Sequence, residues 1–452
     1  MQSIKEQRKE GKAYRKITQR SSLGQWEVKT DRPIVKQLLL KQEATRLPQL
    51  IPERRKRMSV SPFTFFRGSA IIQAHDISSM PGTNLRVQAC GDAHIGNFGI
   101  FASAERRMVF DINDFDETLP APFEVDIKRL LASIEICGRD RGFSRQVRES
   151  AVYEAAANYR NTIAQCCEMG NMAVWYNHLD VEELIQQNEK NVEKEQVKKT
   201  RAIIEKAMNK NSERAVAKLM ETVDGKLRIK SNPPIIVPIR DIMSVDRPYF
   251  DFNFQYSIQK ALEIYKKSLA EDRKRLIDQY EVLELAHKVV GVGSVGRRAW
   301  ILVMMGRENG DPLVLQIKEA EKSVLEDYYG NSVYKKCGRR VVEGQRAIQT
   351  TGDILLGWVQ EKLPDGREID YYVRQLWDSK GSVDLTKITE AEYLALSLLC
   401  SKTLAFAHAK TGNRFALSGY LGKEDVFERA MVNYAAAYAD QNEADFEVFK
   451  TL

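Results

Sequence analysis

The sequence predicts an α+β fold with more than one lobe and with additional helical segments. At 452 residues the chain is longer than one hydrophobic core usually supports, so we expect two or three lobes. Residues 126–225 carry apolar side chains at the 3.6-residue period of a helix, with long charged faces. Residues 284–317 instead contain short apolar runs separated by a glycine-rich segment and a turn, which indicates strands.

The predicted elements begin with a basic, polar segment. Residues 1–30 lack an apolar core, so they predict a mobile arm and not a secretory signal. Residues 31–58 predict a helix that starts at Asp31-Arg32-Pro33. From Val87 to Thr118, short apolar runs and clustered Asp residues predict strands joined by functional loops. The helical pattern of residues 126–225 then continues to a linker at Ser231-Asn232-Pro233-Pro234.

The second half of the chain predicts a β-rich part between helices. A helix is expected at residues 257–280 and further helices at 341–349 and 390–409. Between them, three apolar runs predict an antiparallel meander: Leu285–Val290, Arg298–Met304 and Leu313–Ile317. We divide the chain accordingly into five segments: 1–30, 31–125, 126–280, 281–380 and 381–452.

The composition excludes several classes of protein. Hydrophobic residues make up 43% and charged residues 29%, with a formal charge of +7, and no run approaches the roughly 20 apolar residues of a membrane span. The six cysteines include no C-x-x-C pair, which favours reduced thiols in a cytoplasmic protein over a zinc site or disulfide framework. The basic runs Arg54–Arg57 and Lys198–Arg201 lack interleaved aromatic residues, so no nucleic-acid partner is expected.

Carboxylates and amides cluster in two neighbouring segments. The first is Gly91-Asp92-Ala93-His94-Ile95-Gly96-Asn97, and the second is Val109-Phe110-Asp111-Ile112-Asn113-Asp114-Phe115-Asp116. Phosphoryl transfer needs a base that orients the acceptor hydroxyl, together with oxygen ligands for magnesium beside the nucleotide phosphates. An Asp followed five positions later by an Asn can supply the base and one ligand, and an Asp at the end of a nearby strand can supply the second ligand.

These two segments resemble the catalytic loop and metal-binding segment of aminoglycoside and choline phosphotransferases. The resemblance implies that Asp92 is the base, that Asn97 and Asp114 bind the metal, and that Asp116 assists. It also implies that Asp126, twelve positions after Asp114, anchors the catalytic loop. The chain departs from many of these relatives at Cys90, where they have a histidine that supports the backbone.

Two other interpretations use the same residues. Asp and Asn are common in turns and helix caps, so an Asp-rich loop can be purely structural; we expect this of Asp111. Gly91-Asp92-Ala93-His94 also resembles the opening of metallophosphoesterase motifs, but that chemistry needs several more histidines in a dinuclear site. The chain has only five, none in the expected context, so we reject this interpretation and expect His94 to be structural.

A glycine-rich loop lies in the first hairpin of the predicted meander. Its residues are Gly291, Val292, Gly293, Ser294, Val295 and Gly296. A dinucleotide-binding loop of this pattern would open a helix, whereas here an apolar strand-like run follows. The context therefore resembles the loop of protein kinases that covers the nucleotide phosphates.

A lysine and its carboxylate partner are expected after the glycine loop. Lys318 ends the third run, Val314-Leu315-Gln316-Ile317-Lys318, and the kinase resemblance implies that it contacts the α- and β-phosphates. Glu343 is the candidate partner that holds it in place, with Glu326 as the second candidate. Alternatively, Lys318 is a solubilising residue on an edge strand.

The order of the motifs is reversed relative to protein kinases, which a circular permutation explains. Tyr371–Leu376 resembles the strand that enters the hinge between kinase lobes, so Arg374, Gln375 and Leu376 are expected near adenine. Residues 394–408 resemble the helix that precedes the catalytic loop. Arg67 could reach a phosphate through its planar guanidinium group or could be a buried structural arginine.

Residues 31–452 as a whole resemble an uncharacterised bacterial family, domain of unknown function 2252. The resemblance is carried by Ser61–Gly68, Cys90–Gly99, Asp111–Glu117, Val289–Gly296 and Tyr438–Gln441. The motifs together predict a two-lobed, circularly permuted protein-kinase-like fold that uses ATP and Mg²⁺ to phosphorylate a hydroxyl-bearing small molecule or protein. The alternatives are a nucleotide-binding regulator without catalysis and the transfer of AMP.

Overall fold

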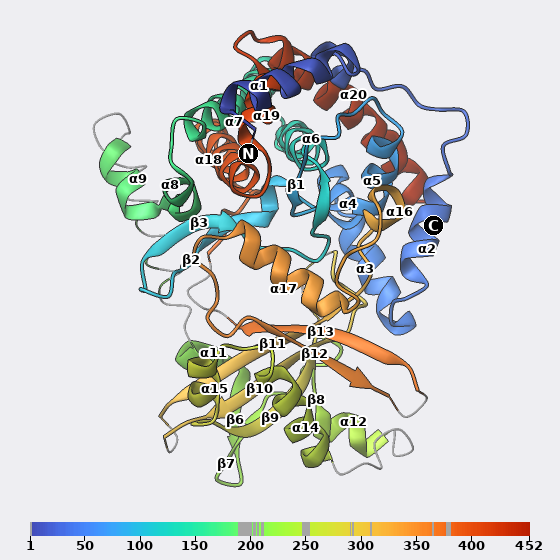
Figure 1. Ribbon diagram of the computed structural model, residues 1–452. Helices are drawn as coiled ribbons and strands as arrows, with labels where there is room; N and C mark the ends of the chain where they lie inside the picture. Colours follow the sequence, from blue (N-terminus) through green and yellow to red (C-terminus); the bar gives the residue numbers. More distant parts are fainter. Residues whose placement is uncertain are drawn as a thin grey trace.

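The chain folds into a mixed α+β structure with a helical region and a smaller region built on one large sheet (Figure 1). The computed structural model describes residues 2–188, 201, 205, 208, 212–245, 254–289, 291, 293–307, 310–363, 366–376 and 381–452. Val292 of the glycine loop lies outside the described residues.

The six-stranded sheet confirms the predicted meander. Its antiparallel strands follow the order β12-β13-β11-β10-β9-β8. Their bounds are β8 Ile236–Pro238, β9 Glu281–Lys288, β10 Ala299–Met305, β11 Pro312–Ala320, β12 Gly357–Lys362 and β13 Glu368–Gln375. The glycine loop joins β9 to β10, and Lys318 pairs with Tyr372 of β13 in the register, so Lys318 lies on an interior strand and not at an edge.

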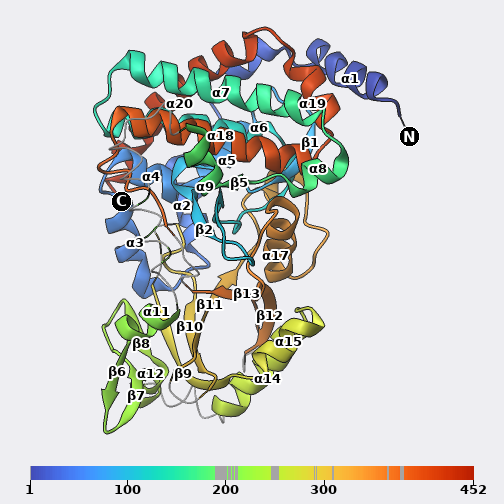
Figure 2. The same ribbon diagram turned by 90° about the vertical axis from the view of Figure 1, so that its left-hand side faces the viewer.

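Both faces of this sheet are covered at its centre, which explains why β10 is an apolar run without polar alternation. Leu302 and Met304 pack toward α14 (Phe254–Lys266) and α15 (Glu271–Ile277). Ile301 and Val303 pack on the other face against α11 (Ser212–Leu219) and the hairpin of β6 (Met220–Val223) and β7 (Lys226–Ile229). Figure 2 shows these two coverings on opposite sides of the sheet. The prediction of helix up to residue 225 was therefore wrong, because this hairpin begins at Met220.

Two helices lie between β11 and β12 in the chain. They are α16 (Glu326–Tyr329) and α17 (Cys337–Ile348). α17 packs against β12 and β13 on one side and against β1 and α18 on the other. It therefore lies where the sheet meets the helical region (Figure 1).

The helical region is built from segments at both ends of the chain. Its long helices are α6 (Glu124–Asp140), α7 (Arg145–Cys166), α18 (Glu390–Thr411), α19 (Arg414–Leu421) and α20 (Val426–Phe449). α8 (Asn171–Tyr176) and α9 (Val181–Asn188) are shorter helices of this region, whereas α12 (Ile239–Val245) packs on β8 and β9 of the sheet. α18 packs on α7, and α20 packs on α6, so segments about 250 residues apart share one hydrophobic core.

The N-terminal segment is folded, contrary to the expected mobile arm. A capping box at Ser3 and Glu6 starts α1 (Ile4–Ala13), and two 3₁₀ turns follow at Tyr14–Lys16 and Arg20–Gly24. α1 packs on α19, the second turn packs on α20, and Leu23 is fully buried.

The helix expected over residues 31–58 is broken in two. The segment forms α2 (Val35–Glu43), a 3₁₀ turn at Pro48–Leu50 and α3 (Ile51–Met58). Pro48 lacks an N–H group and disfavours helical backbone at Leu47, which explains the break. α4 (Pro62–Gly68) and α5 (Ala70–Ser78) follow, and α4 begins with a capping box at Ser61 and Thr64.

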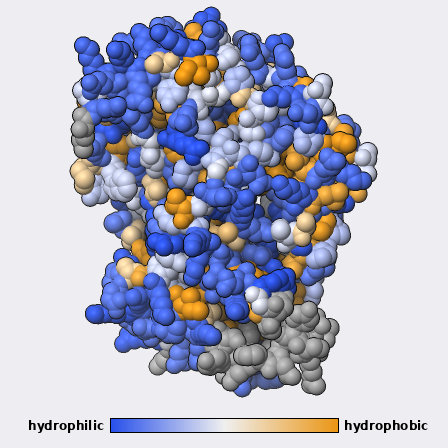
Figure 3. Space-filling model, turned by 45° about the vertical axis from the view of Figure 1, so that its right-hand side comes forward, coloured by the Kyte–Doolittle hydropathy of each residue, from blue (hydrophilic) through white to orange (hydrophobic). Residues whose placement is uncertain are grey.

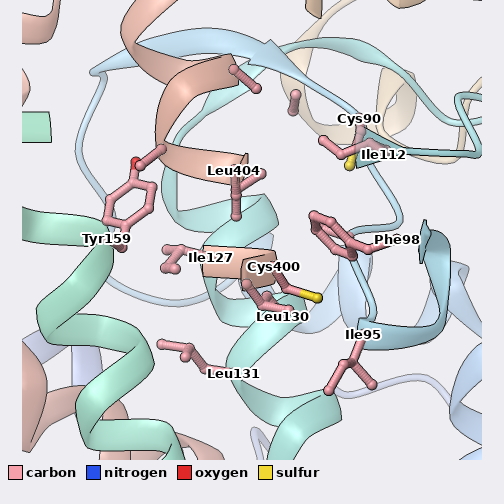
Figure 4. Packing of buried hydrophobic residues seen from close by; sticks show 14 of the residues in the cluster. Cys90, Ile95, Phe98, Ile112, Ile127, Leu130, Leu131, Tyr159, Cys400 and Leu404 are labelled. Atoms are coloured by element: carbon pink, nitrogen blue, oxygen red, sulfur yellow. The ribbon is translucent and has the colours of Figure 1, made fainter. Parts of the chain in front are cut away.

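Short strands position the loops between α5 and α6. β1 (Arg86–Ala89) pairs with β4 (Leu119–Pro122), and β2 (Phe98–Ala102) pairs with β3 (Met108–Ile112), which also pairs with β5 (Leu179–Asp180). Buried side chains from these strands, from α6 and from α18 pack together beneath the loops, as Figure 4 shows for Ile95, Phe98, Ile112, Ile127, Leu130 and Leu404. The loops therefore rest on a fixed core.

The surface is largely polar. On the face shown in Figure 3, hydrophilic residues predominate and hydrophobic residues occur in scattered patches. Among the described residues, every helix is too short or too polar to cross a bilayer.

Candidate functional site

Asp126 of α6 fixes the loop between β1 and β2, here named the Asp92 loop (residues 90–97). The two carboxylate oxygens of Asp126 accept the backbone N–H groups of Cys90 at 2.8 Å and Gly91 at 2.9 Å. Gly91 has a φ of 85°, and a Cβ there would lie 2.2 Å from the carbonyl oxygen of Glu117, so only glycine fits. Asp126 therefore binds the loop that the resemblance implied it would anchor.

A histidine from α18 completes this anchor. Nε2 of His408 lies 3.3 Å from Oδ2 of Asp126, and its Nδ1 lies 2.8 Å from the Tyr159 hydroxyl. His94 is a second buried histidine; its Nδ1 accepts the Gly96 N–H, and burial holds its pKa well below the usual value. His94 thus supports the loop as a neutral ring, in agreement with the structural role we expected.

Asp92 lies at the end of this anchored turn and reaches the cavity. Its Oδ1 accepts a hydrogen bond from Nε of Arg129 at 2.8 Å, and its side chain is 19% exposed. Burial raises the pKa of Asp92 to about 6, although the positive charge of Arg129 acts to lower that pKa. A carboxylate that titrates near neutral pH suits a general base.

The two predicted metal ligands lie next to each other. Nδ2 of Asn97 donates to the carbonyl oxygen of Asp92 at 2.7 Å, and the Asn113 N–H donates to the carbonyl oxygen of Asn97 at 2.8 Å, which brings Asp114 beside Asn97. The Asp114 side chain is 30% exposed, and burial together with neighbouring Asp116 raises its pKa. Asn97 and Asp114 thus offer one amide and one carboxylate to the cavity, and one oxygen of that carboxylate accepts the Asp116 N–H at 3.2 Å.

This donor set is too small for a metal site made of protein alone. In the part of the chain that the structure describes, no group of three or more His, Cys, Asp or Glu side chains is arranged to hold a metal ion. Magnesium usually takes one or two carboxylates, keeps several waters and completes its shell with phosphate oxygens. Asn97 and Asp114 therefore fit magnesium that arrives with a nucleotide, and they do not fit a resident metal such as zinc.

Lys318 of β11 binds the Asp-rich segment across the cavity. Its Nζ lies 3.2 Å from Oδ2 of Asp116 and 3.8 Å from Oδ2 of Asp114. Asp116 also accepts hydrogen bonds from the Tyr372 hydroxyl at 2.6 Å and from Nη1 of Arg297 at 3.1 Å. Burial alone would raise the pKa of Asp116, but Lys318 and Arg297 outweigh it and hold that pKa well below its usual range. Both oxygens of Asp116 are thus engaged, and Asp116 is the closest acidic partner of the lysine.

The predicted pairing of Lys318 with Glu343 is wrong. Glu343 lies on another face of α17, where its Oε1 is 3.6 Å from Arg339 and 3.9 Å from Arg346. The second candidate, Glu326, pairs with Arg340 at 3.7 Å.

The packing of α17 explains this outcome. Gly338 and Gly344 bring the helix so close to its neighbours that a Cβ would lie 2.3 Å from the carbonyl oxygen of Tyr371 and 2.4 Å from the Thr118 side chain. From this buried face Arg340 donates to the carbonyl oxygens of Asp116 and Thr118. The contacting face therefore carries an arginine and glycines, and Glu343 is turned away.

The glycine loop closes over the other side of the cavity. Gly291 and Gly296 have φ values of 69° and 96°, which favour glycine. Ser294 Oγ lies 3.4 Å from Oδ2 of Asp116, and the N–H of Leu47 donates to the carbonyl oxygen of Gly296 at 2.8 Å. The loop thus contacts both the Asp-rich segment and the loop between α2 and α3.

These groups line one cavity of about 90 Å³, which has room for several waters or one phosphate group. It brings together half of the predicted residues with several others: Asp92, Asn97, Asp114, Asp116, Arg67, Gly291, Gly293 and Ser294, with Gln42, Arg46, Gly68, Ala70, His94, Glu117 and Arg297. Lys318 borders it through Asp114 and Asp116.

The predicted hinge residues are placed less favourably for adenine. Arg374 donates to the carbonyl oxygen of Asn113 at 3.1 Å and so links β13 to the Asp-rich segment. The backbone N–H of Gln375 donates to the Asp353 side chain, and that of Leu376 donates to the carbonyl oxygen of Val314 at 2.8 Å. Both N–H groups are therefore already used within the protein, and neither is free to bind a base. Residues 377–380 lie outside the described residues.

Four residues of the site were missed from the sequence. Arg129 was detectable, because it follows Asp126 by three positions on one helix and so shares its face. Arg297 directly follows the glycine loop, and Tyr372 lies opposite Lys318 in the strand register. Arg46 carried no signal in the sequence, since it reaches the site only because the expected helix over residues 31–58 breaks there.

The family model described as "uncharacterized protein conserved in bacteria (DUF2252)" matches residues 46–452. The chain therefore belongs to this family, as the resemblance indicated. The comparison of the chain with curated proteins found no match, and neither did its comparison with solved structures.

Proposed function

We propose that this protein is an ATP- and Mg²⁺-dependent phosphotransferase with a two-lobed, circularly permuted protein-kinase-like fold. The observation that carries the proposal is the contact of Lys318 with Asp116 and Asp114, at 3.2 and 3.8 Å. Lys318 and Asp116 are 202 positions apart in the chain. They come from two motifs that are each weak alone, and the permuted kinase interpretation requires them to meet.

The order of elements in the sheet region gives further support. The glycine loop joins the first two strands of the meander, Lys318 lies on the third, and α17 follows before β12 and β13. Protein kinases have the same succession of glycine loop, β3 lysine and αC helix. In this chain the carboxylate partner of the lysine comes from Asp116 and not from the helix.

The proposed reaction moves the γ-phosphoryl group to a hydroxyl-bearing small molecule or protein. Asp92 accepts the proton of the hydroxyl, whose oxygen bonds to the γ-phosphorus as the bond to the bridging oxygen breaks, and ADP leaves. Lys318 and the glycine loop hold the phosphates, while Asn97 and Asp114 bind the magnesium ion that neutralises the phosphate charge. The raised pKa of Asp92 lets it accept and release a proton near neutral pH.

The decisive experiment measures transfer of label from γ-labelled ATP to a broad set of acceptors, with wild type and Asp92→Asn. We expect transfer by the wild type and a loss of roughly 10²- to 10⁴-fold in the variant, the usual contribution of a general base. The affinity for MgATP, measured by calorimetry, should change little because Asp92 does not hold the phosphates. Equal turnover by the two proteins would rule out Asp92 as the base.

The alternatives have distinct outcomes in the same assay. Label transferred from α-labelled but not from γ-labelled ATP would indicate AMP transfer. MgATP binding without transfer to any acceptor would favour a nucleotide-binding regulator. No stabilisation of the protein by millimolar MgATP would contradict all three, since a ligand at 100 times its dissociation constant stabilises a fold by about 2.7 kcal/mol.

A further inference from the structure

Three arginines and four carboxylates line the cavity, but two of the arginines lie outside its ion pairs. Arg297 is balanced, because it pairs with Asp116 at 3.1 Å, Glu117 at 3.2 Å and Glu321 at 2.9 Å. Arg46 and Arg67 line the same cavity, but neither lies within 4.0 Å of a carboxylate among the residues that the structure describes. Two guanidinium groups beside the glycine loop therefore make no direct ion pair, and the neighbouring carboxylates act on them only at longer range.

Arg46 is the more deeply buried of the two. It is 5% exposed, its Nη1 donates to the carbonyl oxygen of Val295, and its Nε is buried without a hydrogen-bond partner. Burial, together with the positive charges of Arg54 and Arg297, lowers its pKa to about 9. A buried cation with an unused donor is costly unless an anion arrives to pair with it.

Arg67 lies between the two loops of the site. A Cβ on Gly96 of the Asp92 loop would lie 3.5 Å from Nε of Arg67, and a Cβ on Gly293 would lie 3.3 Å from its carbonyl oxygen. Its Nε is also buried without a partner. The absence of side chains at both glycines leaves the arginine room to face the cavity.

We propose that Arg46 and Arg67 form a subsite for one phosphate group between the glycine loop and the Asp92 loop. A phosphate dianion carries charge enough to pair with both guanidinium groups, whereas a carboxylate could pair with only one at full charge. Its oxygens can accept paired N–H bonds from planar guanidinium groups. This subsite rests on the proposed function, which supplies two sources of the group: the terminal phosphate of ATP or a phosphate carried by the acceptor.

Calorimetry separates the two sources. Wild type, Arg46→Gln and Arg67→Gln are titrated with MgADP, with MgATP, and with inorganic phosphate after saturation with MgADP. If the subsite takes the terminal phosphate, both variants should lose roughly 10- to 100-fold affinity for MgATP, as expected for a charge-assisted hydrogen bond, and keep their affinity for MgADP. If it takes a phosphate of the acceptor, both nucleotides should bind normally and the binding of inorganic phosphate should be lost.

Controls distinguish a binding role from a structural one. Arg145→Gln removes an exposed arginine of α7 and should behave like the wild type in every titration. Thermal unfolding without ligand should show Arg46→Gln to be as stable as the wild type or more stable, because the substitution removes a buried charge that makes no direct ion pair. A fall of several degrees would show that Arg46 supports the fold, and would overturn its assignment to the subsite.

Failure of the subsite can be told from failure of the proposed function. If MgADP and MgATP bind the wild type and both variants equally, and phosphate binding is absent or unchanged by the substitutions, the subsite is refuted while the nucleotide site stands. If neither nucleotide binds the wild type, inorganic phosphate is titrated alone. Binding that both substitutions abolish would then support the subsite without a kinase, and no binding would overturn it.

Discussion

The two walls of the cavity are held in different ways. On the helical side, the Asp92 loop is fixed by its own region: Asp126 binds the backbone of Cys90 and Gly91, and Arg129 binds Asp92. On the sheet side, the acidic partners of Lys318 lie across the cavity. The Asp92 loop is therefore held within its own region, whereas the contacts between Lys318 and the Asp-rich segment exist only while the two regions are together. The proposed base is preorganised, and the proposed phosphate-binding lysine depends on its neighbour.

The strongest test of this difference is Asp126→Asn. The amide keeps one acceptor but turns an N–H₂ group toward a backbone N–H, so at least one buried donor loses its bond to a charged oxygen. We expect the free energy of unfolding to fall by roughly 3 kcal/mol, because such bonds contribute about 1.5–3 kcal/mol each. Urea denaturation measures the change.

Asp140→Asn is the matched control, since it removes an exposed carboxylate from the end of the same helix, α6. It should change the free energy of unfolding by less than about 0.5 kcal/mol. If Asp126→Asn were as mild as this control, the helical wall would not depend on its anchor and the contrast between the two walls would be lost.

The next test concerns the partner of the lysine. Asp116→Asn removes the closest negative charge to Lys318, which then keeps only the longer contact with Asp114, while Arg297 keeps its other two carboxylates. We expect the affinity for MgATP to fall by roughly 10-fold, about 1.4 kcal/mol. Glu343→Gln should leave that affinity within about twofold, because Glu343 pairs only with Arg339 and Arg346. A loss of affinity in Glu343→Gln but not in Asp116→Asn would instead support Glu343 as the partner of Lys318.

The smallest expected effect is a shift in the pH dependence of turnover. The pKa of Asp92 is about 6 in the fold, so kcat/KM should fall as the pH drops through 6 and the carboxylate becomes protonated. Arg129→Gln removes a positive charge 2.8 Å away, which raises that pKa and moves the acid limb to higher pH by about one unit. Arg129→Lys keeps the charge and should leave the limb nearly in place. An unchanged limb in Arg129→Gln would show that Asp92 is not the titrating group.

Local patterns predicted the elements of the site but not all of their contacts. The meander, the glycine loop between two strands and Lys318 on the third strand follow from short runs of sequence, and so does the spacing of Asp126 from Asp114. The face of α17 could not be predicted, because it is set by the close approach of Gly338 and Gly344 to other segments. Arg46 reaches the cavity through a helix break, and its contacts come from residues about 250 positions away. Packing between residues far apart in the chain therefore decides these contacts, and the local hydrophobic period of the sequence does not predict them.

The joining of distant segments in the helical region has a consequence for biosynthesis. Asp126 meets His408, which is 282 positions later in the chain, and α6 and α7 pack on α18 and α20. Residues 281–376, which form nearly all of the sheet, leave the ribosome before those last helices. The sheet region can therefore fold first. Until α18 and α20 have been made, the apolar faces of α6 and α7 that they cover stay exposed. Partly made chains of this kind are prone to aggregation, so we expect this protein to need chaperones during its synthesis more than its final surface suggests.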